Sequence, residues 1–302
     1  MTDRELRPFR LRLRTRFRDL LERRGCLIEG ERGWGEFAPF PDYSVAADAR
    51  WLAAAIEQAD GGWPEPCRVE VEVNAIVPAV GPEQAAEMAL ASGCRTIKIK
   101  VGDPDDLGRV AAVRAALPDA RLRIDVNGGW SVAQAAERIS ALSHFGLEYV
   151  EQPVRTFDEM AQLRALVDVP LAADELLRVD RRFDDAARVA DVAVLKVGPL
   201  GGVAATLAVA QRVGLPVVIS SALDSSIGLA AGLAAACTLP RPPLACGLGT
   251  GALLLDDTCP PLLPDAGRMR FTGYPQPDFE PVAEDLDYWR TRIAAAADSS
   301  PV

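Results

Sequence analysis

Short runs of β-branched and other apolar residues alternate with alanine-rich stretches from about residue 69 onward. Eight runs are typical of strands: residues 71–77, 96–102, 121–127, 147–153, 170–175, 192–198, 216–221 and 245–249. Helix-like segments such as residues 82–92, 131–145 and 201–214 lie between them. Parallel strands need crossover helices, so the alternation predicts an α/β fold, a modified (β/α)7β TIM-type barrel whose eighth helix is missing or replaced. An open doubly wound sheet is the alternative.

The two ends of the chain follow a different pattern. Between residues 9 and 18, arginines alternate with Phe, Leu and Thr, which is the period of a strand with one buried and one solvated face. A turn at residues 31–33, one or two helices over 44–60 and a linker at 61–66 follow. We therefore expect an α+β capping domain built from residues 1–66 and 256–302, and a catalytic barrel over 67–255.

Charge and composition narrow the class of partner. The formal net charge is −10, which disfavours nucleic acid and anionic membranes, both of them polyanions. We interpret the arginine row as a solvated strand face rather than a nucleic-acid patch. No apolar leader is visible, and Asp191 and Lys196 interrupt the longest apolar stretch. The six cysteines are scattered without a CxxC pair, which favours a cytoplasmic protein with reduced thiols.

The only histidine, His144, lies where the pattern predicts the C-terminal end of a helix. A histidine-based triad or a multi-histidine metal site is therefore excluded. Acid–base chemistry at neutral pH must fall to carboxylates, lysines or tyrosines.

Charged residues follow the predicted barrel strands at one level. They are Lys98, Lys100, Asp125, Glu151, Asp174 and Lys196, and from Lys100 onward successive strands place them 22 to 26 residues apart. That spacing is about one strand plus one helix, and catalytic groups of such barrels come from the C-terminal strand ends. The alternative is a set of unrelated, solvated strand-end charges.

Three carboxylates on adjacent strands repel one another, and a divalent cation relieves that repulsion. Oxygen ligands favour Mg²⁺, with Mn²⁺ as a substitute, over zinc. Asn127 shares a strand face with Asp125 and is expected to support it. Such a cation would bind a substrate carboxylate while a nearby lysine of lowered pKa removes the α-proton. A Schiff-base aldolase using Lys196 or Lys100, or a non-catalytic barrel, would leave the aligned carboxylates unexplained.

The motifs KIK (98–100), RIDVNGGW (123–130), YVEQP (149–153), AADE (172–175) and VLKVGPLGG (194–202) resemble the muconate-lactonizing branch of the enolase superfamily. The resemblance covers nearly the whole chain, and GWGEFAPFP (33–41) is similar to the loop that closes over the active site in that branch. It implies Asp125, Glu151 and Asp174 as metal ligands and Lys100 as the general acid–base. It also implies that Lys98 supports Lys100 electrostatically and that Lys196 lies on the opposite face of the substrate.

Within the branch, SSALDSSIG (220–228) is most similar to the o-succinylbenzoate synthase family. That family performs a magnesium-dependent syn-dehydration of 2-succinyl-6-hydroxy-2,4-cyclohexadiene-1-carboxylate in menaquinone biosynthesis. Ser225 and Ser226 either bind a substrate carboxylate at a helix N-terminus or act as plain N-caps. Gly249 offers a backbone donor or forms a turn, and Arg123 contacts substrate or supports the site.

The catalytic residues leave rivals open within the branch. N-acylamino-acid racemases need a proton donor and acceptor on opposite faces, and Lys100 with Lys196 would supply both. A dipeptide epimerase is disfavoured because GLGTG (247–251) lacks an Asp-x-Asp pair, and muconate cycloisomerase remains an alternative. We expect a small-molecule carboxylate as the partner and a monomer rather than a homo-oligomer.

Overall fold

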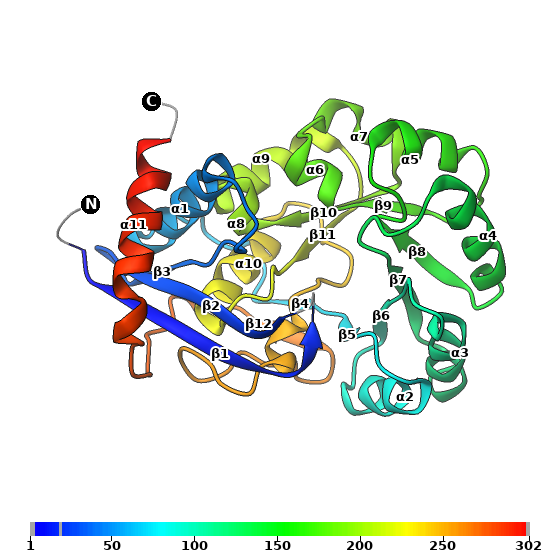
Figure 1. Ribbon diagram of the computed structural model, residues 1–302, viewed down its shortest axis with the longest axis horizontal. Coiled ribbons are helices and arrows are strands. Elements are labelled where there is room, and N and C mark those ends of the chain that lie inside the picture. The colour runs from blue at the N-terminus through cyan, green and yellow to red at the C-terminus, as the bar shows by residue number, and fades with distance from the viewer. Residues whose placement is uncertain (1–3, 18–19, 300–302) are drawn as a thin grey trace.

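The chain passes from an N-terminal antiparallel sheet into a curled parallel sheet and returns to the first sheet with its last helix (Figure 1). The computed structural model describes residues 4–17 and 20–299. The N-terminal sheet contains β1 (Leu6–Phe17), β2 (Leu20–Glu29) and β3 (Trp34–Phe37), which pair antiparallel in that order. The alternation predicted for β1 is confirmed, because Leu11 and Leu13 are buried while Arg12 and Arg14 are exposed; Arg18 lies outside the described residues.

Two long helices cover this sheet. They are α1 (Val45–Asp60), a single helix begun by the Ser44 N-cap, and α11 (Leu286–Asp298). Trp289 of α11 is buried and meets the Phe37 ring edge-on at 5.9 Å. Arg292 binds Asp48 of α1 with an Nε–Oδ2 distance of 2.6 Å. The last helix therefore packs against the N-terminal elements.

Seven parallel strands form the curled sheet, in the spatial order β11-β10-β9-β8-β7-β6-β5. They are β5 (Ala75–Val77), β6 (Thr96–Lys100), β7 (Arg121–Asp125), β8 (Leu147–Glu151), β9 (Leu171–Ala173), β10 (Val192–Lys196) and β11 (Val217–Ser220). The helices that connect and follow them are α2 (Pro82–Ala91), α3 (Asp106–Ala116), α4 (Val132–Ser143), α5 (Phe157–Arg164), α6 (Glu175–Val179), α7 (Ala186–Val189), α8 (Val197–Leu200), α9 (Val203–Val213) and α10 (Ser226–Thr238). The described residues also form the 3₁₀ helices η1 (Phe183–Asp185), η2 (Gly249–Leu253) and η3 (Ala283–Asp285).

Backbone hydrogen bonds of Cys246 and Gly247 join the two edges of this sheet. Gly247 bridges to Ser220, the last residue of β11, and Cys246 bridges to Val73, just before β5. The eighth predicted strand is thus reduced to two isolated bridges. The first predicted strand is split, because β4 (Glu70–Glu72) turns away to pair antiparallel with β12 (Arg268–Arg270). The arrangement is the expected modified barrel, closed by a short irregular segment.

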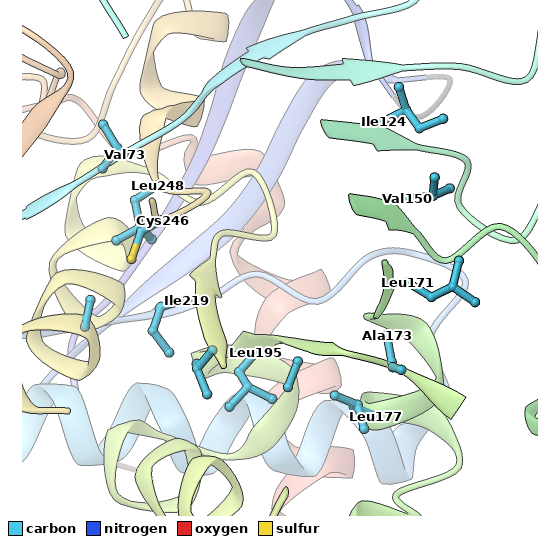
Figure 2. Close-up of a cluster of buried hydrophobic side chains, with 14 of the residues drawn as sticks. Val73, Ile124, Val150, Leu171, Ala173, Leu177, Leu195, Ile219, Cys246 and Leu248 are labelled. Atoms are coloured by element: carbon cyan, nitrogen blue, oxygen red, sulfur yellow. The ribbon is translucent and has the colours of Figure 1, made fainter. Parts of the chain in front are cut away.

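Side chains alternate between the two faces of the barrel strands. Figure 2 shows Ile124, Val150, Leu195 and Ile219 on neighbouring strands within the core between sheet and helices. The residues that precede three of these, Tyr149, Val194 and Val218, point into the barrel and form a separate buried cluster with Ala172 and Val192. This apolar cluster packs within the barrel beneath the strand ends.

Other features bear on the predicted class of protein. His144 is the C-cap of α4, as predicted. All six cysteines are free thiols. Among the described residues, no helix has the length and apolar character needed to span a membrane.

Candidate active site

The predicted strand-end charges converge at the C-terminal mouth of the barrel. Strand pairing sets Lys100 beside Asp125, and Asp125 beside Glu151, on β6, β7 and β8. Asp174 follows β9 directly as the N-cap residue of α6, and Lys196 ends β10. The sequence contains three lysines in all, Lys98, Lys100 and Lys196, and each of them lines one pocket at this mouth.

Ion pairs connect each of these carboxylates to a lysine. Lys98 Nζ lies 2.9 Å from Glu151 Oε1 and 3.1 Å from Asp125 Oδ2. Lys100 Nζ lies 2.6 Å from the same Asp125 oxygen. Lys196 Nζ lies 2.5 Å from Asp174 Oδ2. The six charges therefore form one compensated cluster rather than separate solvated groups.

Asn127 belongs to this cluster, as its position on the strand face of Asp125 predicted. Its side-chain oxygen accepts a hydrogen bond from Lys100 Nζ at 2.5 Å, and its backbone N–H donates to Asp125 Oδ1 at 3.1 Å. Asn127 has φ of 51° and Gln152, which follows Glu151, has φ of 40°. Such left-handed backbone at non-glycine residues costs energy and concentrates at functional sites.

The pKa values of Lys98 and Lys100, the two lysines of β6, are shifted in opposite directions. Burial lowers the pKa of Lys100, the charge of Asp125 opposes this effect and the charge of Lys98 adds to it, so its pKa lies below the ordinary value. Burial also disfavours the ammonium form of Lys98, but Glu151 and Asp125 outweigh it and hold its pKa well above the ordinary value. Lys98 is thus a fixed cation, and Lys100 is the lysine more readily neutral.

The pKa values of the carboxyl groups of Glu151 and Asp174 are also shifted in opposite directions. Burial and the neighbouring charge of Asp125 raise the pKa of Glu151 to about 7. Burial disfavours ionisation of Asp174 as well, but Lys196 and Arg178 outweigh it and lower its pKa to about 2. Strong perturbation by burial and specific charge partners is typical of functional sites.

The donor chemistry of this cluster fits a hard divalent cation. In the part of the chain that the structure describes, no three acidic, histidine or cysteine side chains are already grouped as metal ligands, because each carboxylate is turned toward a lysine. Asp174 Oδ1 is nevertheless buried and accepts no hydrogen bond within the described residues. Three carboxylates on adjacent strands, one with such an oxygen, are the oxygen ligands that Mg²⁺ or Mn²⁺ prefers.

Sequence reasoning missed several residues of the pocket. Besides the lysines, Asp125 and Asn127, its lining comprises Phe17, Ile76, Ser220, Ser221, Ala222, Leu223 and Thr250. The Ser221 and Thr250 hydroxyls share a hydrogen bond of 2.7 Å. Thr250, rather than Gly249, reaches the pocket from GLGTG, and Ser221 reaches it from SSALDSSIG. The lysine count could have indicated this site. The chain is rich in arginine but contains only three lysines, and all three line the pocket.

Ser225 and Ser226 are placed at the N-terminus of α10 but are already bonded to protein carboxylates. Glu36 accepts from the Ser225 hydroxyl and from the Ser225 and Gly228 backbone N–H groups. Asp257 accepts from the Ser226 hydroxyl at 2.6 Å. Both serines are fully buried. Ser225 is the N-cap residue of α10 by position, but its side chain makes no capping hydrogen bond. The geometry favours a structural role, in which both hydroxyls donate to protein carboxylates, over contact with a substrate carboxylate.

Arg123 lies below the cluster, inside the barrel. Its guanidinium donates to Glu148 at 2.5 Å, to Asn74 at 2.9 Å and to the Ala245 carbonyl at 2.6 Å. It therefore ties β7 to the segments that close the barrel and does not line the pocket. Gly249 is also absent from the pocket lining; a Cβ there would lie 2.9 Å from the Asn74 carbonyl oxygen, which explains a glycine.

None of residues 33–41, whose motif resembles a loop that closes over the active site, lines the pocket. The first part of this segment is β3, paired with β2, and residues 34–40 are buried. Phe17, at the end of β1, lines the pocket instead, with its ring 5.4 Å from Lys100 Nζ. Glu36 sits behind the pocket against α10.

The burial of Glu36 predicts a pH-dependent stability. Burial and the charge of Asp224 raise the pKa of Glu36 from 4.5 to about 8, against the opposing effects of Ser225 and Arg23. The folded protein keeps a proton that the unfolded chain releases, so the free energy of unfolding should fall with rising pH between about 5 and 8. Relative to Glu36→Gln, the slope is at most about 1.4 kcal/mol per pH unit. Urea unfolding across this range measures it; parallel curves for the two proteins would contradict it.

Comparison with known proteins agrees with this fold. Residues 82–274 match the family model "Enolase C-terminal domain-like", and residues 9–59 match "Enolase N-terminal domain-like". A muconate lactonizing enzyme from Pseudomonas fluorescens, solved with muconolactone, superposes with a TM-score of 0.78 at 22% identity, covering 95% of this chain and 98% of that one. The chain belongs to the enolase superfamily.

Relatives with higher identity carry a more specific name. The o-succinylbenzoate synthase of Thermobifida fusca is 51% identical over 304 residues, covering 96% of this chain and 95% of the relative. The o-succinylbenzoate synthase of Mycobacterium tuberculosis (strain ATCC 25177 / H37Ra) is 49% identical over 268 residues, covering 86% and 82% respectively. This identity over most of both chains is what the resemblance in the sequence motifs predicted.

Proposed function

We propose that this chain is a lyase that forms o-succinylbenzoate by eliminating water from 2-succinyl-6-hydroxy-2,4-cyclohexadiene-1-carboxylate, a step of menaquinone biosynthesis in the cytoplasm. The observation that carries the proposal is the identity of about half of all residues with curated o-succinylbenzoate synthases over most of the chain. The cluster of carboxylates and lysines at the barrel mouth supplies the chemistry.

Asp125, Glu151 and Asp174 would hold a divalent cation, which we propose to be Mg²⁺ with Mn²⁺ as a substitute. When bound, such a cation supplies positive charge that offsets the negative charge developing on the substrate carboxylate as the α-proton leaves. Asn127 and Lys98 hold Asp125 and Glu151 in place through the hydrogen bonds described above. Phe17, Ile76 and Leu223 give the pocket an apolar side that can receive the ring.

Lys100 is the proposed base. Its lowered pKa increases the fraction of neutral amine that can take the α-proton. The resulting ammonium then returns that proton to the departing hydroxide on the same face, so water leaves and the ring becomes aromatic. Lys98 stays an ammonium and keeps Lys100 more readily neutral. Lys196, at the end of β10, would face the substrate from the other side and stabilise the developing negative charge.

The presence of both Lys100 and Lys196 in one pocket also favours N-acylamino-acid racemisation as a second candidate. Racemisation requires a proton donor and an acceptor on opposite faces, and Lys100 and Lys196 both line the pocket. Dehydration would use Lys100 alone for both proton transfers.

The two candidates predict different results in a direct assay. With Mg²⁺ present, we expect the purified protein to convert the cyclohexadiene carboxylate to o-succinylbenzoate, followed by the change in ultraviolet absorption, and we expect EDTA to stop the reaction. If no conversion occurs with Mg²⁺ present, the dehydratase proposal is wrong. Exchange of the α-proton of an N-succinyl amino acid in D₂O would then test the racemase.

A further inference from the structure

Arg178 lies just outside the lysine pocket, on α6, and its side chain is only 9% exposed. Its guanidinium faces three groups at once. Nη2 donates to Glu175 Oε1 at 2.9 Å, and Nη1 donates to the Tyr43 hydroxyl at 2.7 Å. Nε lies 3.4 Å from Asp174 Oδ1. Arg178 therefore joins the end of β9 to a residue of the N-terminal part of the chain.

The contact between Arg178 and Asp174 is an ion pair without a hydrogen bond. Asp174 Oδ1 and Arg178 Nε are both buried, and neither has a hydrogen-bond partner within the described residues. A buried carboxylate needs a compensating charge. Arg178 supplies that charge to Asp174 at 3.4 Å, while the lone pairs of Oδ1 remain available to another ligand. The second oxygen of Asp174 is the one that Lys196 binds.

Hydrogen bonds continue from Arg178 to the proposed base. Glu175 Oε1 accepts from Arg178 and also from Asn127 Nδ2, the latter at 3.1 Å. Asn127 in turn accepts from Lys100 Nζ at 2.5 Å. The path Tyr43–Arg178–Glu175–Asn127–Lys100 is therefore continuous. It spans the ends of β6, β7 and β9, so a displacement of Arg178 would displace side chains on both sides of the cluster.

Tyr43 is a firm anchor for this path. Its ring packs edge-on against Phe40 at 5.6 Å and Trp51 at 6.5 Å between centroids. Trp51 in turn lies against Gly198 of α8, where an added Cβ would be 2.5 Å from the indole. Tyr43 is thus held by packing between the N-terminal elements and the barrel, so its hydroxyl presents a fixed acceptor to Arg178.

We propose that Arg178, held by Tyr43, is a positioning residue that fixes Asp174 and Glu175 so that Asp174 Oδ1 faces the cation proposed for this site. The inference rests on the proposed function, because it assigns Asp174 as a ligand. The planar guanidinium suits this task, since its fixed fork binds Glu175 and Tyr43 while it compensates the charge of Asp174. A flexible lysine ammonium could keep the charge but not the three orientations.

The test uses two matched variants. Arg292 forms a second group of Arg, Asp and Tyr, with the buried Asp48 at 2.6 Å and the hydroxyl of the exposed Tyr288 at 3.0 Å, and it joins α11 to α1 away from the pocket. Both Arg178→Gln and Arg292→Gln should lower the melting temperature. Only Arg178→Gln should weaken Mn²⁺ binding to the substrate-free protein, by about 10- to 100-fold in calorimetry, and lower kcat by a similar factor. Arg178→Lys should recover part of the loss.

The outcomes separate the inference from the proposed function. If the unaltered protein binds no Mn²⁺, the proposed metal centre itself fails. If it binds Mn²⁺ and Arg178→Gln binds within about twofold of it, or Arg292→Gln loses as much affinity, the positioning role is overturned. If Arg178→Gln does not fold, Tyr43→Phe tests the positioning role instead, because it removes only the hydrogen bond that holds Arg178. We expect a loss of Mn²⁺ affinity of about three- to tenfold from one missing hydrogen bond, and unchanged affinity and kcat would refute the proposal.

Discussion

Replacing Lys100 with alanine is expected to lower kcat for o-succinylbenzoate formation by about 10⁴-fold. A positioned acid or base contributes about 10²- to 10⁴-fold, and Lys100 is proposed to serve as both, which places its loss at the upper end. Burial holds the pKa of its amine below the ordinary value. Steady-state kinetics with the cyclohexadiene substrate measures the effect.

Two controls make the result of Lys100→Ala specific. The variant should retain the fold and bind Mn²⁺, because Lys98 still compensates Asp125 at 3.1 Å. Lys196→Ala should cost dehydration much less, because Lys196 transfers no proton in that reaction, yet it should abolish any racemase activity. If Lys100→Ala keeps most of its turnover, the assignment of Lys100 as base is wrong.

Replacing Glu151 with glutamine is expected to have the second-largest effect. The change removes one proposed ligand and leaves the Lys98 ammonium, 2.9 Å away, without its closest carboxylate. Mn²⁺ affinity should fall by at least about 100-fold, because even the partners that orient metal ligands contribute 10- to 100-fold. The free energy of unfolding at neutral pH should fall by less than about 3 kcal/mol, the cost of breaking a fully ionised buried pair, because the raised pKa of Glu151 leaves this carboxyl partly protonated. Calorimetry and urea unfolding measure the two quantities.

Glu148→Gln is the matched control for this experiment. Glu148 lies on the same strand, β8, and pairs with a buried arginine, Arg123, at 2.5 Å, but at the opposite end of the barrel from the lysines. Its loss should destabilise the protein and leave Mn²⁺ affinity unchanged. Equal affinities for the Glu151→Gln variant and the unaltered protein would remove Glu151 from the proposed ligand set.

The sequence predicted the barrel and the charge cluster because both are repetitive. Each strand end recurs at one interval, so Asp125 and Glu151 could be aligned without knowledge of any contact. The barrel closure was not predictable in this way, since Cys246 and Gly247 form isolated bridges rather than a strand with its own pattern. The same holds for β4, whose partner β12 is almost 200 residues away.

The roles of residues that depend on long-range contacts could not be predicted from the sequence either. Ser225 has the pattern of a helix N-cap, but nothing local indicates that Glu36, 189 residues earlier, takes its hydroxyl. Ser221 lines the pocket because β11 ends at Ser220 and the residues that follow turn along the pocket, and the exact strand end cannot be read from SSALDSSIG. Arg178 acts through Tyr43, a contact between residues 135 positions apart. The count of three lysines can be read from the sequence without knowledge of any contact, and it was the strongest unused indication of the site.

The central claim is that Asp125, Glu151 and Asp174 bind a divalent cation at which the substrate carboxylate meets Lys100. Anomalous diffraction from crystals grown with Mn²⁺ and o-succinylbenzoate tests it most directly. We predict one strong manganese peak among the three carboxylates, with a carboxylate of the product beside it and the ring between Lys100 and Lys196. A manganese peak elsewhere, with the lysine–carboxylate pairs intact and the product bound away from this cluster, would contradict the account.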